Sequence, residues 1–270
     1  PEEEKQMEKT TVNDIAKLAI NGLPVEDSYK AVILNNEFSV ESLEKLQPAP
    51  NRLRQNLNLK TEQSLIDYAN KFKVAGTAIF ADLDELEITA VFDYHADPAN
   101  PRWGDHTATY NCPYSKDWKE WTRKDKQAMS QVEFGAFLEN NIHCIATDGN
   151  IVNGAELLAM VLAFEETRKS EFKSVKRLQD GTMSFTYTDE KTGGGNAKLP
   201  EEIVLGIQPF HNGDYYQVKA RIRYRIKDGS LFLWYELINP EKVVEDAFNT
   251  TLEKLKANIT DVDFYEGVLD

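Results

Sequence analysis

Carboxylate and imidazole side chains gather between residues 93 and 106, and side chains of these types can bind divalent metal ions. The candidate ligands are Asp93, His95 and His106, because imidazole nitrogens and carboxylate oxygens at strand ends could hold such an ion. Their spacing matches no metal-binding signature, and the prolines and glycine around them are typical of a polar turn. The segment therefore predicts an ordinary turn without a resident metal or cofactor, and leaves open a metal-dependent enzyme or ligand-binding site.

His143 and Cys144 form a second candidate pair, since a thiol activated by an imidazole can act as a nucleophile. Neighbouring residues diverge on a helix and point to opposite faces of a strand, so this pair predicts no catalytic function. The chain also lacks the motifs of serine hydrolases, zinc proteases and kinases. Cys112 is the other cysteine, and the two predict buried thiols rather than a disulfide. We therefore expect a non-enzymatic protein with no catalytic residues.

Five cations occupy alternate positions of one predicted strand in the C-terminal third of the chain. A hairpin over about residues 214–238 is indicated by apolar alternation on both sides of Asp228-Gly229, a pair that favours tight turns. Side chains on a strand alternate between its faces, so all five cations project to one side. The candidate binding residues are Lys219, Arg221, Arg223, Arg225 and Lys227.

The five cations of this row repel one another, so they need negatively charged partners. The sequence leaves three sources of such partners open. Acidic residues of the same chain could pair with it, including those of the predicted C-terminal helix; a second subunit could cover it; or nucleic acid could bind to it. The net charge of −14 argues against general affinity for nucleic acid. The partner strand is apolar on both faces, which a second subunit would explain. Its candidate self-association residues are Phe232, Trp234 and Ile238.

Trp118 and Trp121 are flanked by lysines and arginines in a predicted helix. Aromatic rings beside cations could stack on nucleic-acid bases. A helix that packs its tryptophans inward while its lysines stay in water would show the same pattern, and we favour this second interpretation.

The elements that position these residues are helices and strands in separate runs along the chain. This order predicts an α+β fold with antiparallel β-sheets in two meander segments, helices between them and a C-terminal helix. No apolar run approaches the roughly 20 residues that cross a bilayer, so we expect a cytoplasmic protein without membrane contact. The predicted parts are a partly helical leader and arm over 1–60 and one composite domain over 61–270, with meander 74–112, helices 115–166, meander 172–238 and helix 241–257.

Six segments, taken together in order and spacing, resemble the YfdQ-like proteins of phages and prophages, a family with a domain of unknown function. They are residues 64–68, 90–95, 103–106, 118–121, 129–139 and 216–225. The resemblance runs over about residues 12–255. It implies a phage protein in the host cytoplasm, expressed beside replication or recombination genes, and it brings no catalytic residues.

The resemblance and the cationic row together favour a non-enzymatic phage accessory protein. We expect it to form homo-oligomers and to bind a macromolecule of the host or the phage. One alternative is a replication or recombination factor that binds nucleic acid through residues 219–227. Another is an acidic decoy against host defence, since a net charge of −14 suits partners with basic grooves.

Overall fold

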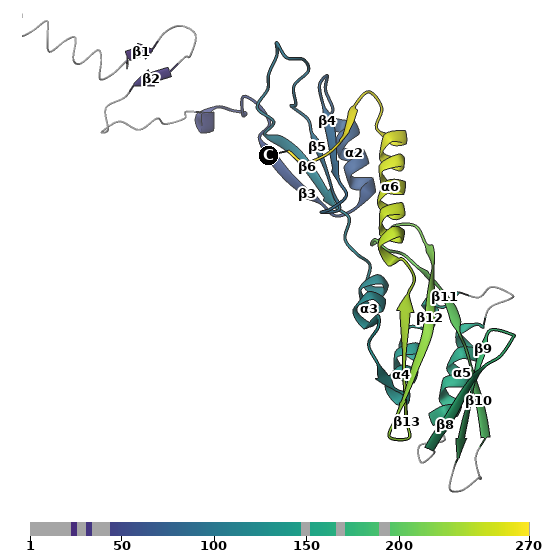
Figure 1. Ribbon diagram of the computed structural model, residues 1–270. Helices are drawn as coiled ribbons and strands as arrows, with labels where there is room; N and C mark the ends of the chain where they lie inside the picture. The colour runs from purple at the N-terminus through teal and green to yellow at the C-terminus, as the bar shows by residue number, and fades with distance from the viewer. Residues whose placement is uncertain are drawn as a thin grey trace, which may run out of the picture. The chain divides into compact units, whose positions relative to one another are not determined.

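The computed structural model describes residues 23–25, 31–33, 44–146, 152–165, 171–188 and 195–269 (Figure 1). The chain divides into two compact units, Pro1–Leu53 and Arg54–Asp270. In the first unit, β1 (Leu23–Val25) and β2 (Ala31–Ile33) form a short hairpin, and η1 (Glu44–Leu46) is a 3-10 turn. The leader expected before residue 22 lies outside the described residues. The second unit begins earlier than the boundary predicted at residue 61, because residues 55–59 form a strand of its first sheet.

A five-stranded sheet begins the second unit, with the strand order β14-β4-β5-β6-β3. The central strands β4 (Ala78–Asp82), β5 (Glu87–Val91) and β6 (His106–Asn111) are the antiparallel meander predicted over residues 74–112. The edge strands β3 (Gln55–Leu59) and β14 (Asp263–Glu266) were not predicted, and both pair in parallel. The sheet is therefore mixed rather than purely antiparallel.

Two helices, α2 (Glu62–Phe72) and α6 (Pro240–Asn258), cover one face of this sheet (Figure 1). Helix α2 begins where the Thr61 hydroxyl accepts a hydrogen bond from a backbone N–H of the first turn. Helix α6 has a proline at its first position, where a missing N–H costs nothing. Leu65 and Phe248 from the helices pack with Ile79 and Ile88 from the strands in one core. Helix α6 confirms the predicted C-terminal helix.

A second core lies between two further sheets and three helices. Strands β8 (Glu171–Arg177), β9 (Thr182–Thr188) and β10 (Gly195–Pro200) form an antiparallel sheet in the order β10-β9-β8. Strands β11 (Glu202–Ile207), β12 (Tyr216–Lys227), β13 (Ser230–Leu237) and β7 (Met129–Ser130) form another, in the order β11-β12-β13-β7. The segment predicted as one meander over 172–238 therefore divides between two sheets, and the division falls at Pro200, which has no N–H to donate to a ladder.

The helices predicted over residues 115–166 are α3 (Lys116–Lys124), α4 (Gln131–Asn140) and α5 (Gly154–Glu165). They contribute Trp121, Phe134 and Leu157 to the second core, each without exposed surface. Trp118 is also buried, so the two tryptophans point inward as we favoured. The chain thus has the predicted α+β fold. Within the described segments, no helix combines the length and apolar character needed to span a membrane.

Candidate functional site

The hairpin of β12 and β13 has the predicted position and turn. Lys227 pairs with Ser230 across Asp228 and Gly229, whose φ angles are 52° and 73°. Two positive φ angles are typical of a type I′ turn, whose twist matches that of the strands. On one face of β12, Val218, Ala220 and Ile222 are buried in the second core, and Ile226 packs against it, whereas Tyr224 is 37% exposed. The geometry of the cationic strand is therefore confirmed.

The five predicted cations all lie on the opposite face of β12, away from the second core. Arg223 is half-buried and the other four are exposed. Arg223 lies directly opposite Trp234 on β13, and Arg225 lies opposite Phe232. Cations and aromatic rings therefore share one surface, which we call the outer face. It comprises Glu202, Lys219, Arg221, Arg223, Arg225, Lys227, Phe232, Trp234, Glu236 and Ile238.

Carboxylates of the two adjacent strands pair with part of the cationic row. Arg221 Nε donates to Glu202 on β11 at 3.1 Å, and Arg223 Nε donates to Glu236 on β13 at 2.9 Å. The other carboxylate oxygen of Glu236 accepts the Trp234 indole N–H at 3.3 Å. The hydrogen bond from Arg223 lowers the pKa of Glu236 below its usual value. Internal pairing was one of the three predicted sources of anions, and it accounts for two of the five cations.

Lys219, Arg225 and Lys227 make no ion pair within the described part of the chain. The Arg225 guanidinium lies 5.7 Å from the centre of the Phe232 ring, a cation–π distance. Helix α6 also contacts β12, but among the described residues it makes no ion pair with these three cations. The acidic tail that follows forms β14 of the five-stranded sheet. As far as the described residues go, three cations of the outer face are therefore left to pair with an anionic partner.

The apolar residues predicted to mediate self-association also lie on the outer face. Phe232, Trp234 and Ile238 are each half-buried. The alternate residues of β13, from Leu231 to Leu237, belong to the second core. The two apolar faces of β13 therefore have different surroundings. One face lies in the second core, and arginine side chains partly cover the other. Self-association through these residues stays a prediction.

Asp93, His95 and His106 hold a turn together by separate hydrogen bonds. The Asp93 carboxylate accepts the backbone N–H of His106 at 2.9 Å. His106 Nε2 shares a hydrogen bond of 2.9 Å with the Tyr68 hydroxyl, and His95 Nδ1 accepts the backbone N–H of Arg102 at 3.0 Å. Burial lowers the pKa of His106, which favours its neutral form. Among the described residues these three do not form a group whose ligand atoms meet, so the weak metal candidates act here as parts of the turn.

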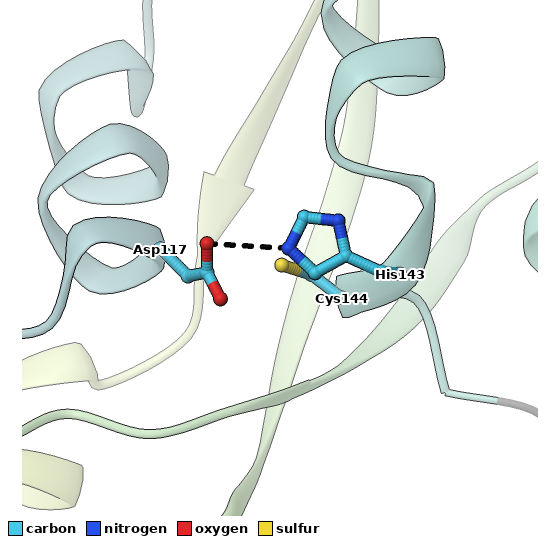
Figure 2. A group of neighbouring side chains, drawn as sticks. All are labelled: Asp117, His143 and Cys144. Atoms are coloured by element: carbon cyan, nitrogen blue, oxygen red, sulfur yellow. Dashed lines mark hydrogen bonds and ion pairs between the residues drawn. The ribbon is translucent and has the colours of Figure 1, made fainter. Parts of the chain in front are cut away.

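The structure instead brings together Asp117, His143 and Cys144 (Figure 2). Asp117 lies in the first turn of α3, whereas the other two lie in η2 (Ile142–Cys144), a 3-10 turn. His143 Nε2 and Asp117 Oδ1 are 3.2 Å apart. We expected the His143 and Cys144 side chains to diverge. They do differ in exposure, but both reach the carboxylate of Asp117. No sequence spacing could indicate this, since Asp117 and His143 are 26 residues apart.

Both cysteines are buried and free, as predicted. Burial raises the pKa of the Cys112 thiol to about 12 and that of the Cys144 thiol to about 11. A thiol with such a pKa is almost fully protonated at neutral pH and is a poor nucleophile. Neither cysteine therefore has the properties of a catalytic nucleophile.

The chain matches the model of one protein family over nearly its whole length. The matching region is residues 3–269, and the family is described as an uncharacterized conserved protein family, DUF2303. No curated protein and no solved structure shows a significant match to the chain. The protein is a member of the DUF2303 family.

Proposed function

We propose that this chain is a non-enzymatic phage or prophage accessory protein that binds single-stranded nucleic acid through its outer face. The observation that carries the proposal is the placement of Arg223 and Arg225 directly opposite Trp234 and Phe232 on one sheet surface. The phage origin and the location in the host cytoplasm rest on the resemblance of six segments to YfdQ-like proteins.

The outer face has the two components that single strands need. Cations can track the backbone phosphates while aromatic rings stack on the bases, and this combination tolerates many sequences. Lys219 and Lys227 are eight residues apart on β12, so the row spans roughly 27 Å. A duplex fits this surface less well, because its bases are already stacked on one another and cannot reach Trp234. Because the protein as a whole is acidic, we expect this binding to be local and sensitive to salt.

A salt-dependent titration with a labelled single-stranded oligonucleotide tests the proposal. The test variant combines Lys219→Glu, Arg225→Glu and Lys227→Glu, the three cations of the row that make no ion pair among the described residues. Removing one cation that binds a phosphate should lower the slope of log K against log salt by about 0.7, so the slope of the triple variant should fall by about 2. The matched control carries the same charge change at the exposed residues Lys60, Lys119 and Lys242, none of which lies on a strand of the outer face.

The control variant should keep the slope and the affinity of the unmodified protein. An equal decrease in both variants would show that only overall charge matters. An absence of binding even at low salt would reject the proposal outright. Trp234→Ala should weaken binding by about 1–3 kcal/mol because it removes the stacking surface, whereas Trp234→Phe should retain most of the affinity.

A second candidate is self-association, which an acidic surface elsewhere in the second unit favours. The face of the five-stranded sheet opposite α2 and α6 carries Asp82, Glu87 and Asp263 at strand positions, and among the described strands no basic residue occupies a position on that face. It also carries Phe80 and Tyr265, whose rings stack at 5.4 Å. The outer face of one copy thus complements this acidic face of another in charge and in aromatic content. Two outer faces would instead repel each other, so we expect a head-to-tail contact.

Light scattering at micromolar concentration measures this self-association. We expect oligomers that dissociate when either face is reversed in charge, by Lys219→Glu with Lys227→Glu or by Asp82→Lys with Glu87→Lys. Each variant still carries one unmodified face of the opposite kind, so an equimolar mixture of the two should restore a contact between one variant and the other. A monomer under all conditions would refute self-association and would leave the nucleic-acid proposal to its own titration.

A further inference from the structure

Three side chains that commonly bind zinc converge beside helix α3. Asp117, His143 and Cys144 offer a carboxylate oxygen, an imidazole nitrogen and a sulfur, and these atoms all lie within 4.8 Å of one another (Figure 2). We propose that this cluster binds a divalent transition-metal ion, with Zn²⁺ as the best fit and water as the fourth ligand.

The separations of the donor atoms are close to those of tetrahedral zinc. Zinc lies about 2.0–2.1 Å from nitrogen and oxygen ligands and about 2.3 Å from sulfur. At a tetrahedral angle, nitrogen and oxygen ligands are then about 3.3 Å apart, and nitrogen and sulfur about 3.6 Å. His143 Nε2 and Asp117 Oδ1 are 3.2 Å apart. The sulfur of Cys144 lies within 4.8 Å of a ring nitrogen of His143 and a carboxylate oxygen of Asp117, so a shift of about 1.2 Å or less would bring it to the separation that tetrahedral zinc requires.

The donor set selects the class of metal. Calcium and magnesium prefer shells made entirely of oxygen, which a thiolate and an imidazole cannot provide. Sulfur and nitrogen ligands favour zinc and related soft or borderline ions. The side chains of Asp117 and His143 are 41% and 59% exposed, so solvent and ions reach the cluster from their side. Three protein ligands with an open position are the arrangement in which zinc keeps a bound water.

A buried hydrogen-bond donor, the indole N–H of Trp121, independently indicates that the sulfur of Cys144 binds a metal as the negatively charged thiolate. The Nε1 atom of Trp121 is fully buried and makes no hydrogen bond within the described structure. This indole N–H lies near the sulfur of Cys144. Trp121 is one turn after Asp117 on α3, so both approach the sulfur from the same side of the helix. A metal-bound thiolate would give this buried donor a strong acceptor, as outer-shell donors do in metal sites.

The same geometry disfavours a Cys-His-Asp nucleophile. His143 Nε2, the nitrogen nearest the cluster, contacts Asp117, so it is not reserved for taking a proton from the thiol. Cys144 is buried, and a thiol in such surroundings keeps its proton when no metal is bound. Metal binding would remove that proton, because a cysteine binds as the thiolate.

Titration of the full chain with Co²⁺, after removal of bound metal by a chelator, tests the proposal. Cobalt replaces zinc and reports a thiolate ligand by its charge-transfer absorption and tetrahedral geometry by intense visible bands. We expect one ion per chain with a dissociation constant at or below about 10 μM, about one proton released, and displacement by Zn²⁺. Cys144→Ser should abolish the charge-transfer band, and His143→Ala should weaken binding at least about tenfold.

The other buried cysteine and another exposed histidine serve as matched controls. Cys112→Ser and His95→Ala should retain the spectrum and the affinity. Octahedral cobalt without a thiolate band, or an equal decrease in the controls, would overturn the proposal, as would the absence of binding at 10 μM or below. If Cys144→Ser does not fold, His143→Ala decides the outcome, because that ring is mostly exposed and contributes little to the core.

Discussion

The ion pair between Arg223 and Glu236 should stabilise the hairpin measurably, whereas the neighbouring pair should not. Arg223 Nε and Glu236 Oε2 are 2.9 Å apart, and each side chain is 33% exposed. The pair of Arg221 and Glu202, at 3.1 Å, is 48% and 45% exposed. Because solvent screens an exposed pair more strongly, we expect a coupling energy of about 1 kcal/mol for the first pair and about 0.3 kcal/mol for the second.

Double-mutant cycles with alanine at each position, followed by urea unfolding at low salt, give the two coupling energies. Glu236→Ala alone should cost more than its coupling, about 1.5–2 kcal/mol, since it also removes the acceptor of the Trp234 indole N–H and leaves Arg223 beside like charges. The exposed pair serves as the matched control on the same face. Equal coupling in both pairs, or none in the first, would refute the reasoning from exposure.

The pH dependence of the first coupling has a definite sign. Arg223 lowers the pKa of Glu236 in the folded state from the ordinary value of 4.5. A carboxylate with a lowered folded pKa contributes its stability above its unfolded pKa and loses that stability as the pH falls through the folded pKa. The coupling should therefore be constant between pH 6 and 8 and disappear in acid, as the pH falls through the lowered pKa of folded Glu236. Coupling that grows on acidification would contradict the assignment.

Three further changes test the packing of the second unit, each by urea unfolding. Gly76→Ala should cost about 2–4 kcal/mol, because φ is +87° and the new Cβ would lie 2.6 Å from the Cα of Ala96; a cost under about 0.5 kcal/mol would contradict that backbone. Tyr235→Phe should cost about 1–3 kcal/mol, since its buried hydroxyl donates to the Trp121 carbonyl; a neutral result would mean that water replaces the donor. Ser130→Ala should cost about 1 kcal/mol by removing the capping box of α4, and Ser130→Asp should restore most of it.

Local signals in the sequence predicted the elements that depend on neighbouring residues. The hydroxyl of Thr61 and the proline at 240 are such local signals, and each marks the start of a helix. Asp228-Gly229 located the hairpin, because positive φ at both positions favours these residue types. The strict alternation of β12 then determined which side chains share the outer face. This part of the candidate site could be predicted because it depends only on the alternation of side chains between the two faces of a strand and on the position of one turn.

Contacts between distant segments could not be predicted in this way. Strands β3 and β14 are short and polar at many positions, and they become strands by pairing with the edges of the meander. The carboxylates that pair with the cationic row were one of several open alternatives, and only the strand register identifies Glu202 and Glu236. The cluster of Asp117 with residues of η2 depends on how α3 packs against that turn, which no local pattern encodes.

The closure of the five-stranded sheet by β14 also has a consequence for how the protein folds. Asn70 on α2 hydrogen-bonds the Asn258 carbonyl at the end of α6, 188 residues later. Closing a loop of that length costs about 2 kcal/mol more entropy than closing one of 20 residues. During synthesis, α2 and the meander leave the ribosome long before α6 and β14, so one edge of the sheet and the part of its face that α6 covers stay exposed. We therefore expect slow folding, with the exposed edge of β4 vulnerable to aggregation until the last strand arrives.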